Sequence, residues 1–284
     1  PMSWLGHLTL DYRRDGERTT AHDRHDGPLR VLQRLYPEGP GVCHHVLVHP
    51  PGGIVGGDVL NVQATLAEHT HAVITTPGAT RFYKSGGATA EQSLVARVAE
   101  GARLEWLPLE TIAYRGCKAI NRMRFELAPG AEMMGWDLLA LGLPAANEAF
   151  DSPDHAEAFF TQEIELPGVW LERGTVKASD HRLLDSPLGW AGHRVSGTFW
   201  FATGSAMPNA RRQLLLDLAR SRIDAMAPEV ACVAGATSAH EQAVVVRALA
   251  ARVEPMMGLL AAIWADWRQE GWQLTPCPPR VWRT

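Results

Sequence analysis

The sequence lacks the short motifs that mark most catalytic and nucleotide-binding sites. It contains no H-E-x-x-H, no G-x-S-x-G, no G-x-x-x-x-G-K-[ST] and no G-x-G-x-x-G after a predicted strand. These absences argue against a zincin, an α/β-hydrolase, a P-loop NTPase and a Rossmann domain. Nothing in the sequence sets a nucleophile on a strained turn, so we do not expect an enzyme.

The chain also lacks an excess of positive charge and a long apolar run. Its formal net charge is −4 over 284 residues, which gives no electrostatic basis for nucleic-acid binding. No stretch approaches the roughly 18 apolar residues of a membrane span. The first residues, 1–7, show no basic and then apolar signal pattern. We therefore expect a cytoplasmic protein that binds neither nucleic acid nor membrane.

Cysteine is scarce and scattered. The four cysteines have no pair at the two-residue spacing of a zinc knuckle or redox motif, so we expect reduced, mostly buried thiols; they are Cys43, Cys117, Cys232 and Cys277. Histidine is more abundant, with twelve residues. The groups Cys43-His44-His45 with His49, and His69 with His71, leave a metal site conceivable, although solvated surface histidines are the more common explanation.

Short strands separated by turn residues dominate the first two thirds of the chain. Alternating or β-branched runs end at Pro-Gly or Glu-Gly pairs, which is typical of an all-β core. The similar spacing of these units hints at a coiled, solenoid-like stack of sheets, although we find no sequence motif that repeats with it. The predicted strands are 7–12, 43–49, 59–66, 71–76, 91–98, 102–107, 123–127 and 162–166.

The C-terminal part differs in composition. Residues 208–226 have helical composition with Asn209 as a possible cap, and 256–267 predict a second helix after Pro255. Two apolar strands, 230–234 and 243–247, lie between them. We predict one mainly β domain over 1–284, β-rich over 1–205 and helix–strand–strand–helix over 206–284. The polar segment 151–157 is the best candidate for a mobile loop.

A glycine-rich segment over residues 49–58 is the most informative local feature. Four glycines lie within ten residues, and the segment ends at Asp58. Glycine is required where φ is positive or where another backbone approaches closely, so this segment predicts a shaped turn between strands. Asp58 then caps the turn or, as the functional alternative, offers a rigidly held carboxylate to a cation.

Acidic residues also interrupt apolar strands. Glu105 and Glu110 flank Leu107-Pro108, Asp137 stands between Trp136 and Leu138, and Glu172 follows Trp170-Leu171. An acid inside an apolar run is unfavourable unless it is paired, hydrogen-bonded or hydrated. Burial against an arginine and exposure to an internal polar channel are equally compatible with the pattern, and Arg173 would point away from Glu172 on a strand.

These segments together resemble the family of urease accessory proteins called UreD, or UreH. The resemblance covers most of the chain in family order, and the ten-residue glycine segment is its most specific part. The matching stretches are Tyr36-Pro37-Glu38, residues 49–58 and 76–85, Leu104 to Pro108, Trp136 to Leu139, Leu143-Pro144 and Pro279 to Trp282.

The resemblance implies a non-enzymatic urease maturation factor with a mainly β fold. Such proteins bind apo-urease together with UreF and the GTPase UreG, and are thought to relay Ni²⁺ through an internal polar tunnel, with no tightly bound cofactor. Oxygen donors in series would let an ion leave each site, whereas thiolates would retain nickel. By match to the family pattern, the expected path comprises Asp58, Thr80, Asp137, Glu172 and, less firmly, Glu110.

Two departures from the family pattern affect this reading. Leu109 precedes Glu110 where the family has glutamine, and the segment 150–161 looks longer than usual. A scaffold that handles no metal, its internal acids being structural, remains an alternative. So does a hydrolase or transferase that uses Asp58 and Asp137 as an acid–base pair, although no nucleophile or cofactor motif favours it.

Overall fold

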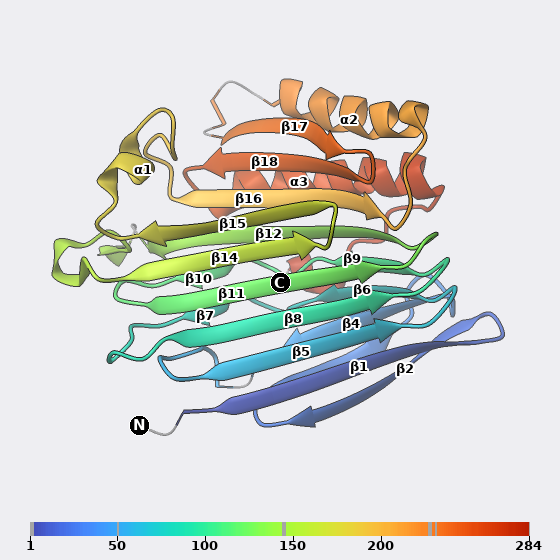
Figure 1. Cartoon of the computed structure of the whole chain (residues 1–284), viewed down its shortest axis with the longest axis horizontal. Helices are drawn as coiled ribbons and strands as arrows, with labels where there is room; N and C mark the ends of the chain where they lie inside the picture. The colour runs from blue at the N-terminus through green and yellow to red at the C-terminus, as the bar shows by residue number, and fades with distance from the viewer. Residues whose placement is uncertain (1–2, 50, 144–145, 227–228, 231, 284) are drawn as a thin grey trace.

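The computed structural model describes residues 3–49, 51–143, 146–226, 229–230 and 232–283. Two large sheets face each other, and helices cover the far side of one of them (Figure 1). The mainly β, coiled architecture with two long helices near the C-terminus confirms the fold expected from the sequence. Pro50 and Pro144, which belong to two of the family-like segments, lie outside the described residues.

The first sheet has seven strands and forms the front of the view in Figure 1. Its strands run parallel in the centre, and an antiparallel hairpin partner lies at each edge. In spatial order they are β15 (Trp170–Lys177), β14 (Phe159–Leu166), β11 (Lys118–Leu127), β8 (Ala90–Val98), β5 (Val59–Leu66), β1 (Leu5–Asp15) and β2 (Arg18–Asp26).

The second sheet has eleven strands and lies behind the first. Three short strands, β7 (Thr80–Phe82), β10 (Thr111–Ala113) and β13 (Glu148–Ala149), join at its side. The main path is β17 (Cys232–His240), β18 (Ala243–Ala250), β16 (Val195–Thr203), β12 (Glu132–Leu143), β9 (Arg103–Trp106), β6 (His71–Thr75), β4 (Val42–Val48) and β3 (Arg30–Leu35).

The chain alternates between the two sheets, so the strands form a solenoid of about three turns. Successive turns add β5 and β6, then β8 and β9, then β11 and β12, each parallel to the strand before it. The turns between them stack: the amide of Ala99 donates to the carbonyl of Leu66 at 3.0 Å, and that of Ala128 to the carbonyl of Val98 at 2.9 Å.

A weak sequence pattern that was not found from the sequence alone accompanies this stacking. Ala67, Ala99 and Ala128 each follow an apolar residue that ends a strand of the first sheet; Leu66 and Val98 are buried, and Leu127 is partly buried. Two residues after each alanine the backbone has positive φ, at His69, Gly101 and Gly130. The repeat is hard to see because a histidine occupies one position that normally favours glycine.

The two long helices cover the second sheet on the face away from the first. They are α2 (Asn209–Asp224), which contacts β17 and β18, and α3 (Val253–Asp266), which contacts β18, β12 and β16. Pro208 rather than Asn209 is the N-cap of α2, and Pro255 lies in the first turn of α3. Short helical segments are η2 (Pro153–His155), α1 (His181–Asp185), η3 (Trp267–Gly271) and η4 (Arg280–Arg283).

Strand β12 decides which side chains face which layer. Its odd-numbered residues, such as Met133 and Leu139, pack into the core between the sheets. Its even-numbered residues, such as Met134 and Trp136, pack beneath the helices. Because side chains alternate along a strand, Asp137 must face the first sheet.

Candidate functional site

A cavity of about 360 Å³ lies between the two sheets, and we call it the inter-sheet cavity. Apolar side chains such as Leu29, Leu47 and Val62 form part of its wall, together with the backbone of the glycine segment at Gly52 and Gly53. Polar residues also line it: His49, Thr76, Thr80, Arg81, Gln92, Ser93, Thr111, Asn121 and Asp137. Such a wall suits a small hydrated solute.

Asp137 is the acid that this cavity contains. Asp137 is only 8% exposed, and its carboxyl group has no hydrogen-bond or ion-pair partner among the described residues. Burial, assisted by the nearby charge of Glu172, raises the pKa of Asp137 from 3.8 to about 7. An unpaired carboxyl group of this kind can exchange a proton for a cation near neutral pH.

Glu172 lies beside this group but has partners of its own. It projects from β15 of the first sheet, and Arg247 Nε of the second sheet donates to its Oε2 at 2.7 Å. The hydroxyl of Thr198 donates to its Oε1 at 3.1 Å. The ion-pair partner of Glu172 is therefore Arg247, 75 residues away in the sequence, and not the adjacent Arg173.

A row of amide side chains crosses the first sheet next to Asp137. Gln92 Nε2 donates to Asn121 Oδ1 at 3.3 Å, and Asn121 Nδ2 donates to Gln162 Oε1 at 3.1 Å. Gln92 and Asn121 line the cavity, while Gln162 Nε2 is buried with no partner among the described residues. Amide oxygens and nitrogens therefore continue the polar wall toward the strand that carries Glu172.

Asp58 lies outside the lining of the cavity and has the geometry of a turn cap. Its Oδ1 accepts from the amide of Trp4 at 2.8 Å and its Oδ2 from the amide of Val55 at 3.0 Å. Both oxygens are committed to backbone donors, and the residue is 1% exposed. This arrangement favours the turn-capping alternative, and it does not bring Asp58 to Asp137 as an acid–base pair.

Thr80 and Glu110 meet through the backbone, since the amide of Thr80 donates to the carbonyl oxygen of Glu110 at 2.9 Å. Thr80 lines the inter-sheet cavity, and its neighbour in register on β10, Thr111, lines it too. The lining does not include Glu110. Of the five acids and hydroxyls expected on the path, Thr80 and Asp137 thus share the cavity, and Glu172 adjoins it.

Two residues of the wall, His49 and Trp106, each carry a buried nitrogen atom that lacks a hydrogen-bond partner among the described residues. These atoms are His49 Nε2 and Trp106 Nε1. Burial lowers the pKa of His49, and the nearby carboxylate of Asp58 opposes that shift. A buried donor or acceptor without a partner indicates a bound solute or water.

The histidine-rich segments do not assemble into a metal centre. Within the described parts of the chain, no three of His, Cys, Asp and Glu converge in a way that could hold a metal ion. His44 bonds Glu38, the Nδ1 of His45 bonds the hydroxyl of Tyr12, and His71 bonds Glu105. All four cysteines are free; Cys43 and Cys117 are buried as expected, whereas Cys232 and Cys277 are only partly buried.

Glu105, unlike Asp137, is fully paired, in a buried ionic cluster beneath the helices. It is 0% exposed and accepts from His71 at 2.7 Å, Trp264 at 2.6 Å and Arg268 at 3.1 Å. Arg268 also forms an ion pair with Glu38, at 2.6 Å. Although burial opposes ionisation, these donors lower the pKa of Glu105 to about 2. The cluster fastens the C-terminal segment to the second sheet.

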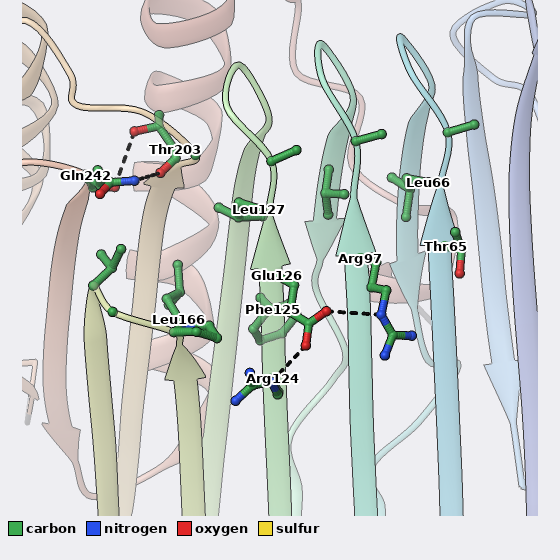
Figure 2. Close-up of a pocket in the computed structure, with 18 residues that line it drawn as sticks. Thr65, Leu66, Arg97, Arg124, Phe125, Glu126, Leu127, Leu166, Thr203 and Gln242 are labelled. Carbon is green, nitrogen blue, oxygen red and sulfur yellow. Dashed lines mark hydrogen bonds and ion pairs between the residues drawn. The ribbon is translucent and has the colours of Figure 1, made fainter.

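A second cavity, of about 640 Å³, lies where the strands of the first sheet end (Figure 2). Its charged side chains neutralise one another, since Arg97 pairs with Glu126 at 3.0 Å and Arg124 with the same carboxylate at 2.9 Å. Thr203 and Gln242 bond to each other across its edge. It offers no unpaired acid to a cation.

The chain belongs to the UreD urease accessory protein family, whose sequence model matches residues 5–283. It is 61% identical to the urease accessory protein UreD of Leptothrix cholodnii and 55% identical to that of Variovorax paradoxus, over the full length of each chain. The corresponding protein of Methylibium petroleiphilum is 54% identical over the same coverage. No helix among the described residues is long and apolar enough to cross a membrane.

Sequence reasoning did not anticipate the amide row, Thr111 or Arg247. Gln92 and Asn121 sit at alternating, inward positions of β8 and β11, and an inward polar residue was the available signal. Arg247 carried no such signal, because only the pairing of β16 with β18 and the approach of β15 bring it to Glu172.

Proposed function

We propose that this chain is a urease maturation factor that assembles with UreF and UreG on apo-urease and passes Ni²⁺ toward the urease active site. The family and its full-length relatives named as urease accessory proteins support the coarse role. The role is non-catalytic, and nickel is a transient cargo rather than a resident cofactor.

We further propose that the inter-sheet cavity is part of the nickel path. The observation that carries this proposal is Asp137, an acid with no partner among the described residues, in a cavity whose partly apolar wall also offers hydroxyl and amide groups. Ni²⁺ entering the cavity would displace the Asp137 proton and gain a carboxylate ligand. Because few donors converge there, the ion can also leave, as transport requires.

The proposed path contains Thr80 and Asp137 within the cavity and Glu172 beside it. Glu172 is held by Arg247 and Thr198, so an ion that takes this carboxylate must displace the guanidinium group. Asp58 supports the path from outside by holding the glycine segment in shape. Glu110 contributes its carbonyl oxygen to the backbone bond that positions Thr80.

The test is activation of urease at limiting nickel in cells that lack their own copy of this protein. We expect the wild-type chain to restore activity and nickel content, and Asp137→Asn to restore far less of both. Glu165→Gln, on the outer face of the first sheet, is the matched control. Full activation with Asp137→Asn would contradict the path.

Co-purification of UreF, UreG and urease with each variant separates the path from a pure scaffold. We expect Asp137→Asn to retain all three partners while nickel delivery falls. If the partners are lost together with activity, the residue supports assembly, and the scaffold alternative gains.

A further inference from the structure

We propose that His49 is the nitrogen donor of the inter-sheet cavity and makes it prefer borderline transition cations such as Ni²⁺ and Co²⁺ over Mg²⁺. This inference rests on the proposed function for its cargo, and it adds a ligand and a basis for selectivity. Oxygen donors alone suit Mg²⁺ and Ca²⁺ as well as nickel, whereas imidazole favours later first-row metals.

The position of His49 is fixed by the backbone around it. The residue follows β4 directly and opens the glycine segment, and the amide of Gly52 donates to its carbonyl oxygen at 2.9 Å. A Cβ on Gly53 would lie 2.0 Å from the Tyr83 ring, so the turn packs too closely for any larger residue there. The imidazole is therefore presented to the cavity by a shaped turn.

The ring nitrogen has the state that a ligand needs. His49 is one of the residues that line the cavity, and its Nε2 is buried with no partner among the described residues. Burial favours the neutral ring, which keeps a lone pair for a metal. Asp58 lies near enough to influence the ring, but its two oxygens are occupied by the amides of Trp4 and Val55.

A partly hydrated cation would also satisfy the second unpartnered nitrogen of the wall. Trp106 Nε1 can donate a hydrogen bond but cannot bind a metal. A water that remains on the cation could accept from it, while His49 Nε2 binds the metal directly. A single imidazole among oxygen donors holds the ion less tightly than a three-ligand site, which is compatible with release.

His45 is a nearby histidine that the proposed site excludes because of its position. Its Nε2 is also buried without a described partner, but its Nδ1 bonds the Tyr12 hydroxyl at 2.8 Å, and it does not line the cavity. It lies four residues from His49 on the preceding strand, so its effect on metal binding tests the geometry closely.

The experiment is titration of the purified full-length chain with Co²⁺, Ni²⁺ and Mg²⁺, followed by calorimetry and, for Co²⁺, by visible absorption. We expect His49→Gln to weaken Co²⁺ and Ni²⁺ binding by about tenfold or more, equivalent to about 1.4 kcal/mol, and to leave Mg²⁺ binding unchanged. Asp137→Asn should weaken all three cations. His45→Gln and the exposed His25→Gln serve as controls that keep wild-type affinities.

Two outcomes overturn the inference, and they differ in what they say about the proposed function. Unchanged Co²⁺ affinity in His49→Gln with weakened binding in Asp137→Asn removes His49 and leaves the path intact. Unchanged affinity in both variants removes the cavity as a cation site altogether. If His49→Gln does not fold, His49→Asn replaces it, and the wild-type protein labelled on histidine should show the His49 ring signal broadened by Ni²⁺ before that of His25.

Discussion

Thr198 connects Asp137 to Glu172. It is the direct neighbour of Asp137 in register on β16, and its hydroxyl donates to Glu172 at 3.1 Å. The two acids therefore belong to one polar patch between the sheets, yet only Glu172 has a cation, Arg247, to balance it. This asymmetry leaves Asp137 as the acid of the patch whose charge changes near neutral pH.

The charge state of Asp137 should appear in the pH dependence of stability. Its carboxyl group ionises at its ordinary value in the unfolded chain and near pH 7 in the folded one. Between those values the unfolded state loses the proton first, so stability falls as pH rises and levels off above about 7.

Asp137→Asn should therefore be more stable than the wild type at pH 8, by at most roughly 4 kcal/mol, and nearly equal to it at pH 4. Urea unfolding across this range measures the difference. The exposed Asp154→Asn, with no such environment, is the control. If the difference in unfolding free energy between Asp137→Asn and the wild type stays constant with pH, the raised pKa of Asp137 is contradicted.

Glu105 should be among the acids on which folding depends most. Glu105→Gln removes one of the two carboxylates that neutralise the buried guanidinium of Arg268, Glu38 being the other, and we expect a loss of up to roughly 3–5 kcal/mol at pH 7. Glu163 pairs with Arg173 at the surface, so for Glu163→Gln we expect the free energy of unfolding to fall by less than about 1 kcal/mol.

The pH dependence of Glu105 has the opposite sign to that of Asp137. Because the folded pKa is lowered to about 2, its stabilisation is fully present above its ordinary value and is lost as pH falls toward 2. The double variant Glu105→Gln with Arg268→Met should recover part of the loss in urea unfolding. A double variant as unstable as the sum of the single variants would show that the two residues do not act together.

Asp58→Ala should destabilise the N-terminal edge of the first sheet by roughly 1–3 kcal/mol, because two backbone amides lose their acceptor. Limited proteolysis near Trp4 should accelerate, and Asp58→Asn, which keeps one carbonyl oxygen, should show a smaller change. Unchanged stability with lost nickel delivery would instead favour a ligand role for Asp58.

Gly53→Ala should displace the glycine segment, because the new Cβ would lie 2.0 Å from the Tyr83 ring. We expect roughly 1–3 kcal/mol of destabilisation in thermal or urea unfolding. Tyr83→Ala in the same chain removes the clash and should restore part of it. A Gly53→Ala variant that is as stable as the wild type would mean that the turn adapts freely.

The sequence was informative wherever the signal is local. Alternation along single strands placed β5 at the residues that the structure has, and Pro-Gly pairs located the turns. The helix–strand–strand–helix order after residue 206 followed from composition. The predicted set of strands omitted several, β2, β3 and β16 among them. Element ends and caps also differed, as at Pro208, which is the N-cap of α2 in place of Asn209.

The candidate site was only partly accessible in this way. Glu105 and Asp137 carry the same local signal, an acid inside an apolar run, but only the first proved to be paired with arginine. Side-chain alternation sends Glu105 toward the helices and Asp137 toward the first sheet. Which of these layers contains a guanidinium group depends on residues more than one hundred positions away.

Strand pattern, turn chemistry and family were thus determined by the sequence alone, because each depends on residues that are close together in the chain. The tertiary structure decided which acids are neutralised, which donors share a cavity and which histidine faces it. Those properties arise when the solenoid brings distant strands into register, and the free energy of a buried charge depends on what surrounds it rather than on its position in the sequence.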